Sequence, residues 1–155
     1  AEQTPFHAPS GNDAKDFFWG CLAEKCLNQG VSLMYAYILT DKETYLTNAY
    51  RNMDYILGRN ATGFCYVTGL GTKSPEHPHH RLSASDDIKA PIPGFLVGGP
   101  NPGQQDKAFY PTASPDESYV DTEDSYASNE VAINWNAALV ALSSSLDALA
   151  VDSVK

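Results

Sequence analysis

The chain has 155 residues, of which 43% are hydrophobic and 19% charged, with a formal net charge of −9. This length and composition predict one globular domain with a hydrophobic core and exclude a disordered or fibrous chain. The acidic charge argues against nucleic acid or an anionic membrane as partner, because phosphate binding needs clustered lysine and arginine, and leaves a neutral ligand such as a carbohydrate compatible.

Two helices are expected in the first part of the chain. In the first, at about residues 22–39, apolar side chains recur at helical spacing: Leu27, Val31, Met34 and Ile38. Gly30 weakens this helix, so packing must compensate for it. A capping box of Thr40 and Glu43 is expected to open the second helix, at about residues 41–57, which Gly58 ends in a left-handed conformation.

A third helix is expected at about residues 129–150, where one apolar stripe has helical spacing: Val131, Trp135, Leu139, Leu142, Leu146 and Leu149. The intervening residues 58–128 are rich in Gly, Pro, Asn and Ser, and loops of this length are either binding loops or disordered segments. The many aromatic residues in this range argue against disorder. The sequence therefore predicts an all-α scaffold with a long ordered loop that carries a site.

Cysteine usage points to packing and away from chemistry. Cys21, Cys26 and Cys65 are odd in number and form no CxxC pair. We expect buried thiols that behave as small hydrophobic residues, in preference to a disulfide or a zinc site.

Groups that could do chemistry are concentrated in residues 75–81, PEHPHHR. A zinc site needs three or four converging ligands, whereas the neighbouring His79 and His80 point apart in an extended chain and Arg81 would repel the cation. A solvated polar loop is the plain alternative. Sugar binding fits better, because imidazole and guanidinium donate directional hydrogen bonds. His79 and Arg81 would then line one wall, with His80 facing the protein.

An acidic stretch follows about forty residues downstream, with these carboxylates: Asp116, Glu117, Asp121, Glu123, Asp124 and Glu130. Glu130 is expected in the first turn of the third helix, where the helix dipole favours the charged carboxylate. A general acid must instead be protonated, so burial or a neighbouring carboxylate such as Asp121 or Asp124 would have to oppose the dipole. The alternative is an ordinary first-turn glutamate.

Two long motifs resemble those of glycoside hydrolase family 9, a cellulase family. The first is TGLGTKSPEHPHHR, in which His79 and Arg81 stand as the family's H-x-R, and the second is YVDTEDSYASNEVAINWNA, which contains Asp121, Tyr126 and Glu130. Shorter pieces follow in the family's order: FFWG, NQG, YILGRN and LVGGPN. Departures are small: Cys65 replaces a Ser, Thr or Val, and WGCL replaces WGSN.

The resemblance implies an inverting hydrolase of cellulose or related β-1,4-glucans, built on an (α/α)6 barrel. It assigns Glu130, Asp121 and His79 to catalysis, with Glu130 as general acid and Asp121 orienting these groups or tuning Glu130. It assigns His79, Arg81 and Tyr126 to substrate binding. No cofactor is required, although Asp86 and Asp87 are candidate ligands for a structural calcium. A secreted, extracellular or periplasmic location is implied.

The family's catalytic base lies in a DAGD-like motif near the start of the domain, and these 155 residues contain no such motif. Twelve helices of about 11–12 residues also need a much longer chain. Residues 1–155 are therefore expected to be a C-terminal fragment of one catalytic domain, inactive and unstable without its N-terminal remainder. A non-catalytic glucan-binding module and a purely structural fragment stay open as alternatives.

Overall fold

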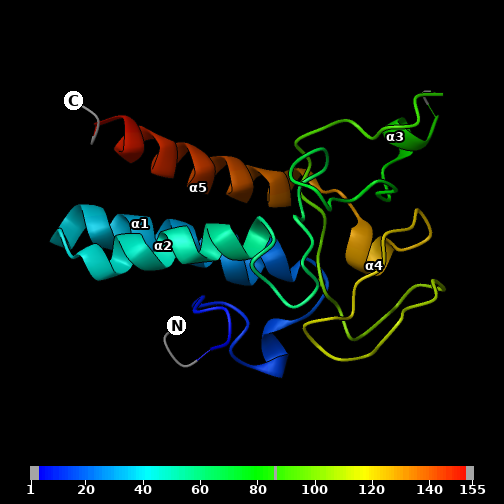
Figure 1. The fold of residues 1–155 in the computed structure, drawn as a ribbon, viewed down its shortest axis with the longest axis horizontal. Helices are drawn as coiled ribbons and strands as arrows, with labels where there is room; N and C mark the ends of the chain where they lie inside the picture. The colour runs from blue at the N-terminus through cyan, green and yellow to red at the C-terminus, as the bar shows by residue number, and fades with distance from the viewer. Residues whose placement is uncertain (1–3, 86, 153–155) are drawn as a thin grey trace.

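The computed structural model describes residues 4–85 and 87–152, in which a layer of helices carries a long irregular segment (Figure 1). The elements in chain order are η1 (Ala14–Asp16), η2 (Leu22–Leu27), α1 (Asn28–Thr40), α2 (Glu43–Ile56), α3 (Arg81–Ser85), α4 (Tyr126–Asn129) and α5 (Ile133–Asp152). In these ranges the extended segments form only isolated β-bridges, so the all-α prediction is confirmed. None of the described helices is long and apolar enough to span a bilayer.

The helical layer is formed by α1 and α2 side by side, with α5 packed along them (Figure 1). Its centre is fully buried and consists of these residues: Cys26, Leu27, Ala49, Ile56 and Leu142. Gly30 lies where α1 meets α5, and a Cβ atom added there would lie 2.5 Å from Cδ2 of Leu142. Glycine at this position therefore permits the close approach of the two helices. This packing compensates for the low helix propensity of Gly30, as expected from the sequence.

The junctions around α1 and α2 differ from the expected ones. The range 22–39 begins as the π-helical turn η2 and continues as α1. The capping box is wrong: Lys42 is the N-cap of α2 and makes no side-chain cap, while Asp41 ends α1 with a φ of 54°. Thr40 belongs to the last turn of α1, where its hydroxyl donates to the carbonyl of Ala36 (2.6 Å).

The end of α2 follows the sequence pattern. Gly58 has a φ of 120°, and its N–H donates to the carbonyl of Tyr55 (3.4 Å). The N–H of Arg59 donates to the carbonyl of Asp54 (2.9 Å). These two bonds form a Schellman motif, in which a glycine accepts the positive φ without steric cost.

The range 129–150 is not one helix. The short helix α4 ends at Asn129, residues 130–132 are not helical, and α5 begins at Ile133. Glu130 has extended backbone angles (φ −72°, ψ 147°) and follows α4 as its C-cap. The expectation that Glu130 occupies the first turn of a helix, under its dipole, is therefore wrong.

The long segment between α2 and α4 is ordered by pairing with distant parts of the chain. Three isolated bridges join its stretches: Val67 with Leu96, Val97 with Val131, and His79 with Glu130. The side-chain amide of Asn136, in α5, accepts the N–H of Leu96 (2.8 Å) and donates to the carbonyl of Leu96 (3.3 Å). Tyr66 is completely buried and packs its ring against that of Tyr119 (centroids 5.2 Å apart).

All three cysteines are buried free thiols, as predicted. Burial raises the pKa of Cys21 to about 12 and also raises the pKa of Cys26 and Cys65. The raised pKa values favour the protonated thiols at neutral pH, which suits packing.

Candidate active site

Main-chain pairing brings the two sequence motifs together. His79 and Glu130 form a parallel bridge, and the N–H of His79 donates to the carbonyl of Asn129 (2.9 Å). On the other side, the N–H of Gly98 donates to the carbonyl of Glu130 (3.0 Å). Glu130 is therefore held by its backbone between two segments of the long loop, and its side chain is partly exposed beside His79.

The carboxylate of Glu130 has a partner from the N-terminal part of the chain. The indole N–H of Trp19 donates to Oε2 of Glu130 (3.1 Å). Trp19 lies between η1 and η2 and is 41% exposed, which is unusual for a large aromatic residue. Its N–H fixes one carboxylate oxygen and leaves Oε1 for other contacts.

Aromatic rings adjoin this carboxylate. The ring of Tyr126, in the first turn of α4, lies 5.3 Å from that of Trp19 and 6.1 Å from that of His79. The Tyr126 hydroxyl donates to the carbonyl of Gln105 (2.7 Å), so the ring is fixed in place. Exposed, rigid rings beside polar groups are suited to stacking on the apolar faces of sugars.

His79 is oriented by a main-chain acceptor. Its Nδ1 atom is hydrogen-bonded to the carbonyl of Glu123. A carbonyl can only accept, so Nδ1 must carry a proton. In the neutral ring Nε2 is consequently an acceptor, and in the charged ring it is a second donor.

Asp121 does not contact Glu130 directly but organises the histidine loop. Its Oδ2 accepts the N–H of Glu76 (2.8 Å), and its Oδ1 accepts the N–H of His77 (2.9 Å) and the Nδ2–H of Asn129 (3.0 Å). Three donors thus converge on the Asp121 carboxylate, which ties the residues before His79 to Asn129.

Asn129 is a buried hub that links the two motifs. Besides Asp121, its Nδ2 donates to the carbonyl of His77 (2.7 Å), and its Oδ1 accepts the hydroxyl of Tyr119 (2.6 Å). Burial, followed by the charge of Asp121, raises the pKa of Tyr119 well above its ordinary value. The Tyr119 hydroxyl therefore remains a donor across the physiological range.

The two residues that follow His79 diverge. The His80 ring packs against that of Phe95 (centroids 4.9 Å apart), and its Nδ1 pairs with the hydroxyl of Ser83 (3.0 Å), so His80 faces the protein as expected. Arg81 begins α3 with an exposed side chain. Among the described residues its guanidinium has no ion-pair partner, which leaves it available to a ligand.

The described residues offer no arrangement that could hold a metal ion: no three or more of their His, Cys, Asp and Glu side chains are so grouped. For the calcium prediction, Asp86 lies outside the described residues and Asp87 is exposed.

Two contributors were not identified as site residues from the sequence. Trp19 stands in the FFWG piece, which carried no chemistry of its own, and its contact with Glu130 spans 111 residues. Asn129 directly precedes Glu130, and its only sequence signal is an amide in the second motif. Both depend on tertiary contacts that no local pattern predicts.

Comparison with known proteins shows the family of the chain. The sequence pattern of glycosyl hydrolase family 9 matches residues 2–143. The xyloglucan-specific endo-beta-1,4-glucanase BoGH9A of Bacteroides ovatus is 92% identical over 155 residues, which are the whole of this chain and 26% of that protein. Endoglucanase D of Acetivibrio thermocellus is 40% identical over 124 residues, covering 80% of this chain and 18% of that protein.

Solved structures give the same result. The structure described as Bacteroides ovatus GH9 matches with a TM-score of 0.88 and 85% identity over 96% of this chain and 25% of that one. AaCel9A in complex with cellobiose-like isofagomine matches with a TM-score of 0.84 and 38% identity over 94% of this chain and 28% of that one. The chain thus spans about a quarter of the BoGH9A and AaCel9A chains. It belongs to glycosyl hydrolase family 9 and forms part of that family's (α/α)6-barrel catalytic domain.

Proposed function

We propose that this chain supplies the general acid and part of the sugar-binding surface of an inverting endo-β-1,4-glucanase. The observation that carries the proposal is the carboxylate of Glu130, held by the Trp19 N–H next to the rings of Tyr126 and His79. A single carboxylate fixed beside exposed rings suits protonation of a glycosidic oxygen on a stacked sugar.

The reacting proton belongs on Oε1 of Glu130. Oε2 accepts the hydrogen bond from the Trp19 N–H. In the protonated carboxyl group Oε2 is therefore the carbonyl oxygen, and the proton is on Oε1. Oε1–H would donate to the leaving oxygen. His79, whose Nδ1 is engaged by the Glu123 carbonyl, presents Nε2 to a sugar hydroxyl, and Arg81 adds guanidinium donors.

Inversion needs a second carboxylate that activates water, about 6.5–9.5 Å from the acid. Asp121 is unsuited to this role, because main-chain and amide donors engage both of its oxygens. We assign the base to the part of the relatives' length that this chain does not span.

That remaining part has a surface on which to pack. A largely apolar groove of about 630 Å³ runs between α2 and α5. Its lining includes exposed side chains that a complete domain would cover: Tyr50, Leu57, Leu70 and Val140. The 155 residues alone are consequently expected to aggregate and to show no glucan hydrolysis.

The relative BoGH9A is described as xyloglucan-specific, and its 92% identity makes a branched β-1,4-glucan the preferred substrate class for this protein. Cellulose itself is the broader alternative. Comparing initial rates on xyloglucan, unbranched soluble cellulose derivatives and mixed-linkage glucan tests this assignment.

Replacing Glu130 by Gln in the complete enzyme tests the mechanism. Glutamine keeps the shape but cannot deliver the proton, so kcat should fall by about 10²–10⁴-fold while oligosaccharide binding persists. Glu117→Gln, at an exposed position on the same loop, is the matched control. Proton NMR of the first product should show the inverted α-anomer. Unchanged turnover in the Glu130→Gln variant would favour the non-catalytic binding or structural alternatives.

A further inference from the structure

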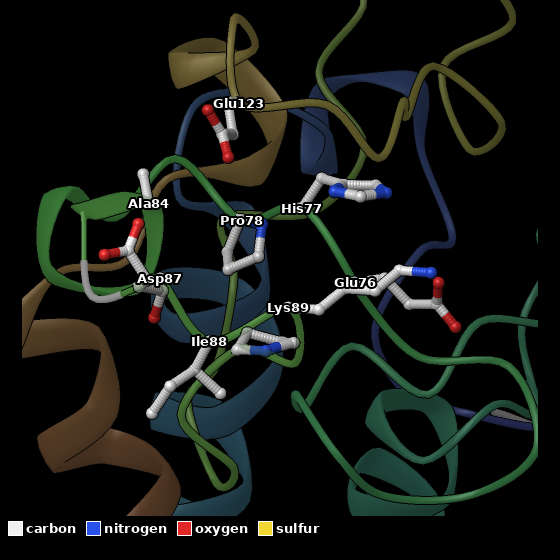
Figure 2. Close-up of a pocket in the computed structure, with 10 residues that line it drawn as sticks. Glu76, His77, Pro78, Ala84, Asp87, Ile88, Lys89 and Glu123 are labelled. Atoms are coloured by element: carbon white, nitrogen blue, oxygen red, sulfur yellow. The ribbon is translucent and has the colours of Figure 1, made fainter.

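A polar hollow lies beside the histidine loop, separate from the apolar groove between α2 and α5. It has a volume of about 320 Å³ and is lined by charged side chains that include Glu76, Asp87, Lys89 and Glu123 (Figure 2). A second hollow of about 370 Å³ adjoins it. The two share four lining residues: Glu76, His77, Lys89 and Pro91. The two hollows thus lie on either side of shared residues, and they are named here the two lobes of one hollow.

The hollow is connected to the candidate active site through two residues. Pro78, which directly precedes His79, lines it, and in Figure 2 Glu123, Asp87 and Lys89 lie around Pro78. Glu123 contributes its side chain to the hollow, while its carbonyl holds Nδ1 of His79. A ligand in the hollow would therefore lie within one residue of the imidazole proposed to bind the main sugar chain.

The chemistry of the lining favours a neutral polyhydroxylated ligand. Carboxylates and an ammonium group accept and donate hydrogen bonds to hydroxyls, and Pro78, Ile88 and Pro91 add apolar faces for a sugar ring. A metal ion is disfavoured, because the acidic groups of the described chain are not grouped closely enough to hold one.

We infer that this two-lobed hollow binds a branch sugar of the glucan substrate. The inference rests on the proposed function, in which the main chain passes along Trp19, Tyr126 and His79. A main-chain glucosyl unit at His79 would direct a substituent into the adjoining hollow. The mixed-charge lining, with Lys89 in both lobes, then distinguishes a branched glucan from an unbranched one.

Binding of thio-linked oligosaccharides to the complete enzyme tests the inference without turnover. The probes are thio-linked cellotetraose and the same tetrasaccharide carrying xylosyl branches, measured by isothermal titration calorimetry. Lys89→Ala should weaken the branched probe about fivefold to tenfold more than the unbranched one, because it removes a charged donor. Asp87→Asn should lower the same affinity ratio. Lys42→Ala, at the N-cap of α2 and outside the lining of both lobes, is the control.

Equal losses for both probes, or no change in their affinity ratio in either variant, would overturn the branch-sugar site. So would a wild-type enzyme that binds the two probes equally. Failure of the proposed function is recognised separately, as unchanged turnover in the Glu130→Gln enzyme. The affinity ratio of the two probes reports on binding in the hollow whatever the result for Glu130→Gln, because the thio-linked probes are not hydrolysed.

Discussion

The indole N–H of Trp19 donates a 3.1 Å hydrogen bond to Oε2 of Glu130, although 111 positions of sequence separate the two residues. Trp19 precedes the helical layer and Glu130 lies between α4 and α5, so their contact exists only when the layer and the long loop are both folded. The candidate site is thereby coupled to the fold, and the bond leaves Oε1 for the proton transfer proposed above.

Replacing Trp19 by Phe separates the hydrogen bond from the ring. The aromatic surface stays, but the donor to Glu130 is lost, so we expect kcat to fall about tenfold with a smaller change in KM. Trp19→Ala should also raise KM, because it removes the stacking surface. Tyr37→Phe, which removes a polar group from α1, controls for general effects. An unaltered kcat in the Trp19→Phe variant would show that the bond does not serve catalysis.

Replacing Asp121 by Asn should loosen the histidine loop. The asparagine amide keeps one oxygen as acceptor, but its N–H₂ group faces a main-chain N–H that the carboxylate accepts in the wild type. We expect this to lower the free energy of unfolding by about 2 kcal/mol. KM should rise, because His79 follows this loop. Faster hydrogen exchange at the amides of Glu76 and His77 would show that the loosening occurs in the histidine loop. Asp124→Asn, at an exposed neighbouring position, should change neither the stability nor KM. Retained protection of the Glu76 and His77 amides in the Asp121→Asn variant would contradict the proposed role of Asp121.

Local patterns predicted the helices but not the break that shapes the site. The apolar stripes of α1 and α5 arise from spacing along one segment, which a sequence displays directly. The stripe of α5 runs back to Val131, yet residues 130 and 131 leave the helix to pair with His79 and Val97. Those bridges join residues far apart in the sequence, so the apolar periodicity alone predicted a start of α5 that is too early.

The site residues were found by motif resemblance more than by physical derivation. The spacing of His79, Arg81, Asp121 and Glu130 carried the family's pattern, whereas composition alone left Glu130 as an ordinary glutamate. The donors to Asp121, the hub at Asn129 and the donor Trp19 could not be predicted, because each depends on where the loop folds back. Ile38 belongs to the apolar stripe expected for the first helix yet is 67% exposed, which agrees with a chain that forms part of a larger barrel.

Replacing Gly30 by Ala tests the close approach of α1 and α5. Alanine favours a helix by about 1 kcal/mol, but its Cβ would lie 2.5 Å from Cδ2 of Leu142, and overpacking costs about 1–3 kcal/mol. We expect net destabilisation of about 1 kcal/mol by thermal unfolding of the complete enzyme. Ser32→Ala, at an exposed position of α1, should not destabilise. A Gly30→Ala variant more stable than the wild type would show that Leu142 moves aside freely.

Alkaline pH should destabilise the fold through its buried tyrosines. Burial raises the pKa of Tyr66 and Tyr119 well above the ordinary value of about 10, so the folded chain keeps protons that the unfolded chain releases. The free energy of unfolding is therefore fully retained below about pH 10 and falls as pH rises above it, by about 1.4 kcal/mol per pH unit for each such group. Chemical denaturation at stepped pH measures this slope.

The variant Tyr119→Phe isolates one of these groups. It should be less stable than the wild type at neutral pH, because Asn129 loses the hydroxyl that donates to it, yet its stability should fall less steeply above pH 10. Tyr35→Phe, at a position that is 65% exposed, is the matched control and should leave the slope intact. An identical slope in wild type and Tyr119→Phe would mean that this hydroxyl ionises inside the folded chain, against the burial and the neighbouring Asp121 charge that hold its proton.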